Sequence, residues 1–71
     1  MSMETKVSYK KLWLCLVQND MKKADLREKA DISPSTMTKL SKNELVALSV
    51  LVKICNVLEC DIGDIMEVIN E

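Results

Sequence analysis

The segment 22–43, KKADLREKADISPSTMTKLSKN, carries the pattern of two short helices joined by a tight corner. Leu26 and Ala30 lie four residues apart, a spacing that puts both side chains on one face of a first helix. Ser33 followed by Pro34 marks the start of a second helix, because serine caps helices well and proline suits the first helical position. The segment therefore predicts a helix, a turn and a second helix.

The second helix of this segment is expected to have one buried and one polar face. Met37 and Leu40, three residues apart, form the buried face. The opposite face can form hydrogen bonds nearly everywhere and carries Ser35, Thr38, Lys39 and Lys42. Two helices about a tight turn, with such a face on the second, have the helix-turn-helix geometry that enters the major groove of DNA.

Length and composition indicate a single small globular domain over residues 1–71, with 48% apolar and 30% charged residues. No apolar run approaches the roughly 20 residues of a membrane span, and residues 1–6 lack the apolar stretch of a signal peptide. The net charge is −1, but residues 1–43 hold nine basic and five acidic residues, whereas residues 44–71 hold one lysine and six acidic residues. Such a chain can present a basic face to an anionic partner while staying nearly neutral.

Three cysteines, Cys15, Cys55 and Cys60, are an odd number in a chain without a signal sequence, which predicts a reducing cytoplasm and buried free thiols. We expect no metal site, because the chain has no histidine and no Cys-x-x-Cys pair. A glycine-rich phosphate loop and a nucleophile–base pair are also missing, so we expect neither catalysis nor a cofactor.

Helical spacing continues outside the segment 22–43. Residues 1–6 are expected to form a flexible arm, and further helices are expected at about 9–18, from about 48, and at about 62–69. The predicted inward positions are Leu12, Trp13, Leu16 and Val17, then Leu48, Leu51, Val52, Cys55 and Leu58, and finally Ile62, Ile65, Met66 and Ile69. The prediction is an all-α, compact five-helix bundle in which residues 44–71 support the helix-turn-helix.

Two lysines, Lys22 and Lys23, open the first helix of the segment, where the helix dipole disfavours cations. A bound phosphate would resolve this conflict; the alternative is a pair of solvated lysines. On the second helix, Ser35, Thr38 and Lys39 are candidates for reading base edges. Thr36 and Lys42 are candidates for holding phosphates. The alternative interpretation of the second helix is an ordinary solvated face.

In these features the chain resembles the Cro and phage-repressor class (CI-type, XRE-like) of small DNA-binding regulators. The matching positions are Leu26, Ala30, Ile32, Ser33, Ser35, Thr36, Met37 and Leu40. The closing part of the chain also matches, at Leu51, Ile54, Cys55, Leu58 and the segment 61–65, DIGDI. The resemblance implies a lambda-repressor-like fold, double-stranded DNA as ligand and a homodimer on a near-palindromic site. It thus implies that the chain regulates transcription by sequence-specific binding, and we expect it to act as a repressor. No small-molecule effector can be identified from the sequence.

The chain departs from this class at several positions. Lysines stand at 22 and 23, where the class often has a polar residue and glutamine, and Pro34 replaces a frequent long polar side chain. Arg27 stands where the class favours alanine, and Asp31 stands at a corner that favours glycine. Aspartate tolerates positive φ better than most residues, so the corner remains feasible.

A homodimer would double the DNA contacts of a nearly neutral protomer. Leu14, Leu45 and Val68 are candidate dimer contacts, because they lie off the predicted core stripes. Two other functions stay open at this point. One is the DNA-binding antitoxin of a toxin–antitoxin pair, with the acidic residues 44–71 as partner surface. The other is a protein-interaction module that has lost DNA binding.

Overall fold

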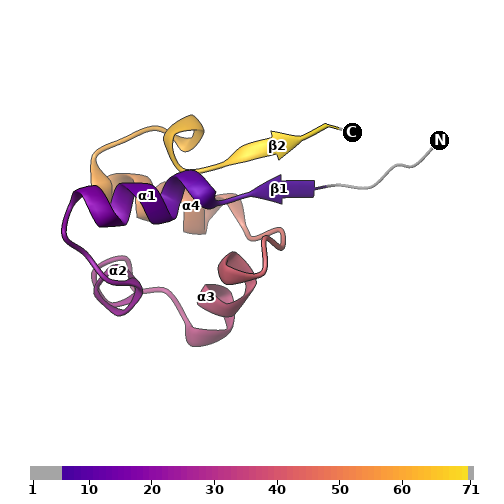
Figure 1. Cartoon of the computed structure of the whole chain (residues 1–71). Coiled ribbons are helices and arrows are strands. Elements are labelled where there is room, and N and C mark those ends of the chain that lie inside the picture. Colours follow the sequence, from indigo (N-terminus) through magenta and orange to yellow (C-terminus); the bar gives the residue numbers. More distant parts are fainter. Residues whose placement is uncertain (1–5, 71) are drawn as a thin grey trace.

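The computed structural model describes residues 6–70. Its elements in chain order are β1 (Lys6–Ser8), α1 (Lys10–Gln18), α2 (Lys23–Lys29), α3 (Pro34–Ser41), α4 (Leu48–Leu58), the 3-10 turn η1 (Ile62–Asp64) and β2 (Glu67–Ile69). Within the described residues the fold is therefore four α-helices with one two-stranded sheet. The two strands lie side by side at one side of the molecule, and α2 and α3 lie together beneath α1 (Figure 1).

The predicted fifth helix over 62–69 is wrong. One 3-10 turn is followed by β2, which pairs antiparallel with β1 in the register Lys6↔Ile69 and Ser8↔Glu67. The reason is non-local: residues 67–69 find backbone partners in a segment from the other end of the chain, which a reading of local spacing does not detect. Lys6, assigned to the flexible arm, lies in this sheet, and residues 1–5 of that arm lie outside the described residues.

The core receives side chains from every helix. The largest side chains that are almost fully buried are Tyr9, Leu12, Leu26, Leu40, Ile54 and Ile65. In α4 the predicted stripe is partly wrong, because Leu48 and Val52 are exposed and Ile54 is buried in their place. This helix contacts α2 and η1, so it turns the face with Leu51 and Ile54 inward. In α1 Val17 is likewise exposed, whereas Leu12 and Leu16 are buried as predicted.

Each α-helix is followed by a residue with positive φ: Asp20, Asp31, Asn43 and Glu59. At the corner between α2 and α3, Asp31 has a φ of 53°, as expected for a residue standing where glycine is favoured. The next amide, Ile32 N–H, donates to the carbonyl of Arg27 at 2.9 Å. The left-handed conformation of Asp31 and this hydrogen bond end α2. The chain then reaches Ser33, the N-cap of α3, after one further residue.

Tyr9 ties the start of α1 to the segment after α3. Its backbone N–H donates to Asn43 Oδ1 at 3.1 Å, and its hydroxyl donates to the carbonyl of Glu44 at 2.8 Å. Burial raises the pKa of Tyr9, so the hydroxyl remains a donor at neutral pH. Both bonds fix the connection that carries the chain from α3 to α4.

We expect Tyr9→Phe to lower the free energy of unfolding by about 1 kcal/mol, or up to about 3 if water cannot reach the carbonyl of Glu44. The aromatic ring remains, so only the hydrogen bond is removed. Urea denaturation followed by circular dichroism measures the change. A midpoint equal to that of the wild-type chain would contradict the role of this hydroxyl.

Candidate nucleic-acid interface

The N-terminus of α3 is held by a cluster of hydroxyl groups. The Ser33 hydroxyl oxygen accepts from the N–H of Thr36 at 3.3 Å, and this hydroxyl donates to Thr36 Oγ1 at 2.9 Å. Ser35 Oγ lies 3.2 Å from Ser33 Oγ. The predicted cap at Ser33 and the first helical position of Pro34 are therefore confirmed. Thr36 is half-buried, whereas Ser35 is exposed.

The rotation of α3 is set by Met37 and Leu40, both of which are buried. The opposite side chains are exposed: Ser35, Thr38, Lys39 and Lys42. Thr38 donates its hydroxyl hydrogen to the carbonyl of Pro34 at 3.1 Å, which leaves its oxygen as an acceptor and its methyl group for apolar contact. The structure thus brings the candidates for base contacts together on one open face.

The first turn of α2 contains an acidic residue, Asp25, that the charge argument for Lys22 and Lys23 did not take into account. The backbone N–H of Lys22 donates to Asp25 Oδ2 at 2.9 Å. A carboxylate three residues after the cap satisfies an otherwise unpaired amide and suits the positive end of the helix dipole. The spacing of Asp25 was the available sequence signal. The lysine pair therefore does not require a phosphate to account for it.

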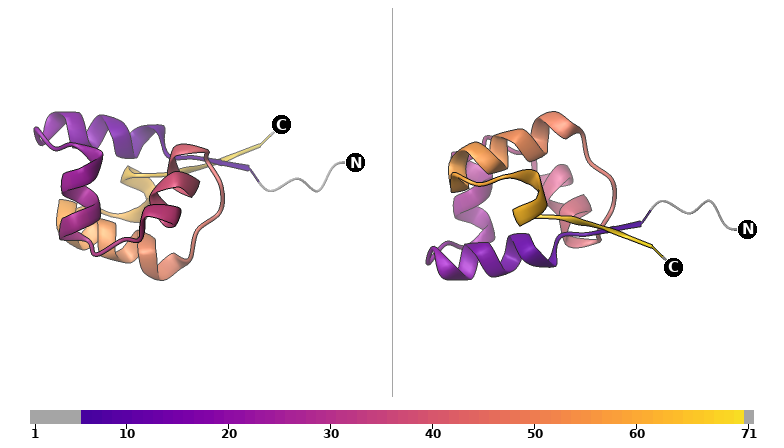
Figure 2. Two further views of the ribbon diagram at one scale, coloured as in Figure 1. Left: turned by 90° about the horizontal axis from the view of Figure 1, so that it is seen from below. Right: turned by 90° about the horizontal axis from the view of Figure 1, so that it is seen from above.

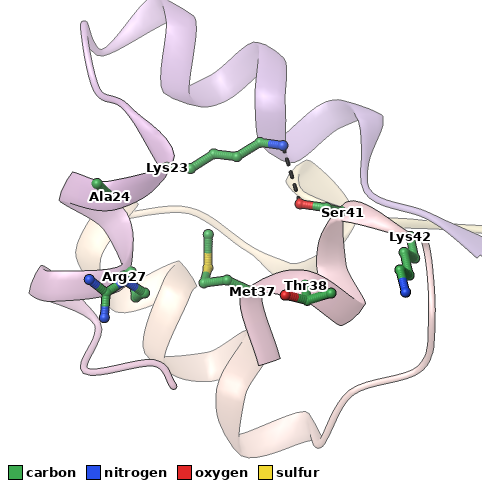
Figure 3. Close-up of a pocket in the computed structure, with 7 residues that line it drawn as sticks. All are labelled: Lys23, Ala24, Arg27, Met37, Thr38, Ser41 and Lys42. Carbon is green, nitrogen blue, oxygen red and sulfur yellow. Dashed lines mark hydrogen bonds between the residues drawn. The ribbon is translucent and has the colours of Figure 1, made fainter. Parts of the chain in front are cut away.

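Lys23 joins three helices. Its ammonium donates to Ser41 Oγ of α3 at 3.2 Å (Figure 3), and its Nζ lies 4.2 Å from the centroid of the Trp13 ring of α1. A lysine over the face of an indole is attracted by the negative face of the ring. Lys23 thus helps to hold α2 against its two neighbours, in addition to any contact with a ligand.

A shallow groove of about 360 Å³ separates α2 from α3 (Figure 3). Its lining includes cations and hydroxyls from both helices, above an apolar floor: Lys23, Arg27, Met37, Thr38, Ser41 and Lys42. Sequence reasoning did not select Arg27 and Ser41 as site residues. The departure from alanine at position 27 was the available signal, because a long cation between two packed helices must extend outward.

The three thiols are free, with Cys55 buried and the other two half-buried. Burial raises the pKa of Cys60 to about 11, so this thiol stays protonated at neutral pH. Within residues 6–70 no group of three or more histidine, cysteine, aspartate or glutamate side chains is arranged to hold a metal ion. The helices of the same range are too short or too polar for a bilayer crossing.

A family model described as Cro/C1-type HTH DNA-binding domain matches residues 11–71. Among solved structures, the crystal structure of transcriptional regulator VanUg, Form II, is similar with a TM-score of 0.92 and 51% sequence identity. The similarity covers 99% of this chain and 93% of that chain. The comparison with curated proteins finds no match.

The strand pair lies apart from the candidate interface. Seen from the other two sides in Figure 2, β1 and β2 extend from a body formed by the four helices.

Proposed function

The chain belongs to the Cro/C1-type helix-turn-helix family of DNA-binding domains, and on this premise we propose that it regulates transcription by binding specific sequences of duplex DNA. In this proposal α3 docks in the major groove, and occupancy of the site blocks transcription, so that the chain acts as a repressor. The similar structure is that of a transcriptional regulator, which supports the regulatory part of the proposal.

The observation that carries the proposal is the exposed polar face of α3. Met37 and Leu40 anchor the helix, and the side chains opposite them are free to meet an incoming duplex. We propose base contacts for Ser35, Thr38 and Lys39, with Lys39 donating to guanine O6 or N7. We propose phosphate contacts for Lys22, Lys23, Thr36 and Lys42, where Lys23 adds its charge while it donates to Ser41.

Selection of bound sequences from a pool of random duplexes tests this function. We expect one short motif to be enriched, repeated in inverted orientation with centres about one helical turn apart. A chain that is folded by circular dichroism and enriches no motif would contradict sequence-specific binding. Retention of all duplexes with equal affinity would indicate phosphate contacts alone.

We propose that two copies bind the inverted repeat as a homodimer. Leu48 and Val52 lie one turn apart on α4 with 63% and 45% of their surface exposed, and Leu45 just before this helix is 55% exposed. The other two candidate dimer residues, Leu14 and Val68, are also exposed. Exposed apolar side chains that gather on one face mark interaction surfaces. We therefore choose the exposed apolar side chains of Leu48 and Val52 on α4, together with Leu45 just before this helix, for the dimer contact.

We expect Leu48→Glu to abolish cooperative binding to a duplex with two half-sites, because a charge on each copy would be buried in the contact. Binding to a single half-site should remain. Val17→Glu is the matched control, since Val17 is also exposed but lies on α1. Sedimentation of the protein–DNA complexes measures the stoichiometry. A wild-type chain that occupies the two half-sites independently would contradict the dimer.

A further inference from the structure

The three cysteines of the chain gather where α1 meets the segment that follows α4. Cys15 and Cys60 line one surface hollow of about 340 Å³, together with Lys11 of α1. Cys55 and Cys60 line a second hollow, of about 530 Å³, and Cys60 thus belongs to both. The residues that line the two hollows come from α1, α4 and the segment after α4, so the proposed DNA contacts use none of these thiols.

The backbone brings Cys55 and Cys60 together. Glu59, which follows α4, has a φ of 53°, and the N–H of Cys60 donates to the carbonyl of Cys55 at 3.1 Å. Such a closure of a helix end commonly places the side chains of its first and last residues in contact. Here the two thiols are hydrogen-bonded to each other. Cys15 has a different partner, because its Sγ accepts from Asn19 Nδ2 at 3.7 Å.

The surroundings of this pair disfavour thiolates but not a disulfide. Three acids, Glu59, Asp61 and Asp64, line the same hollow. Burial raises the pKa of Cys55 and raises that of Cys60 to about 11, and the negative charge of Asp64 raises both further. A disulfide carries no charge, so neither burial nor the acids oppose its formation from the two thiols.

We propose that Cys55 and Cys60 are a redox-sensitive dithiol, which a small-molecule disulfide such as oxidised glutathione converts to an intramolecular disulfide. The half-buried Cys60 loses its proton and attacks the small disulfide, which forms a mixed disulfide and releases one small thiol. Cys55 then loses its proton and attacks the sulfur of Cys60, which forms the Cys55–Cys60 bond and releases the second small thiol. The chain gives up two electrons and two protons, and the small disulfide takes up both. Because the attacking species is the thiolate, the exchange is slow at neutral pH.

The disulfide closes a ring across the left-handed turn at Glu59. This turn leads through η1 to Ile65, which is 0% exposed, and on to β2. A covalent link restricts the unfolded chain more than the folded one, in which the two residues are already in contact. Oxidation therefore stabilises the domain and leaves the exposed face of α3 unchanged. The inference does not depend on DNA binding.

Peptide analysis of the oxidised chain tests which thiols react. The full chain is incubated with oxidised glutathione, its remaining thiols are blocked with N-ethylmaleimide, and it is digested with trypsin. The peptide 54–71, which follows Lys53, contains Cys55 and Cys60 but not Cys15. We expect this peptide to lose two hydrogens and to carry no maleimide. A peptide that keeps both thiols, carries glutathione or is linked to the peptide with Cys15 would overturn the inference.

Urea denaturation of the oxidised and the reduced chain tests the effect on folding. We expect oxidation to raise the unfolding midpoint of the wild-type chain, and dithiothreitol to reverse the change. Cys15→Ala is the matched control and should show the same rise, whereas Cys60→Ala should show none. An unchanged or lower midpoint in the oxidised wild-type chain, or an equal rise in Cys60→Ala, would overturn the inference. The peptide analysis uses the wild-type chain, so it stands even where a variant fails to fold.

Discussion

Leu40→Ala is expected to lower the free energy of unfolding by about 2–5 kcal/mol, the usual cost of this truncation in a packed core. Leu40 is 0% exposed and is one of the two side chains that hold α3 against the body. A domain of 71 residues has a small core and marginal stability. The variant should therefore be largely unfolded or close to its unfolding transition, as urea denaturation would measure.

Val17→Ala is the control for this substitution, because it also truncates an apolar side chain to alanine, at a position on α1 that is 73% exposed and outside the proposed dimer contact. Surface substitutions usually change stability by less than about 0.5 kcal/mol. Equal destabilisation by the two substitutions would show that α3 is not anchored through Leu40. DNA binding should be weakened in Leu40→Ala, since the readout face depends on this anchor.

Lys39→Ala is expected to weaken binding to the selected sequence by about 1–3 kcal/mol, which is roughly 5- to 150-fold, with little effect on a scrambled duplex. The physical reason is the loss of the proposed base contact from the exposed face of α3. Fluorescence anisotropy with the two labelled duplexes measures both affinities. Lys53→Ala on α4 removes the same charge as a control. An equal loss on both duplexes would reassign Lys39 to the phosphate backbone.

Helix positions were predictable where the signal is local. The Ser33–Pro34 pair fixes the beginning of α3, because the cap bond and the first turn involve only adjacent residues. The same holds for Asp31, whose positive φ follows from its place after α2. The spacing of Asp61 and Asp64 is a local signal of the same kind, and in the structure the N–H of Asp61 donates to Asp64 Oδ2 at 3.0 Å. The cap opens a single 3-10 turn, however, and not the predicted helix.

Features that depend on segments distant in the chain were not predictable from spacing. The apolar spacing of residues 62–69 is as regular as that of the segments that do form helices, with Ile62, Ile65, Met66 and Ile69 on one face. Residues 67–69 nevertheless pair with β1. The exposed face of α3 could be predicted, because Met37 and Leu40 fix its rotation. The groove with Arg27 could not, because it arises from the placement of two helices against each other.

The antiparallel pairing of β1 with β2 has a consequence for synthesis on the ribosome. Residues 6–8 are made early, but their backbone partners at 67–69 emerge only after all four helices. Val7 is buried in the complete fold, but it lacks its partner strand until residues 67–69 have been translated. A nascent chain arrested before Glu67 would contain α3 but would lack the strand pair that closes the domain.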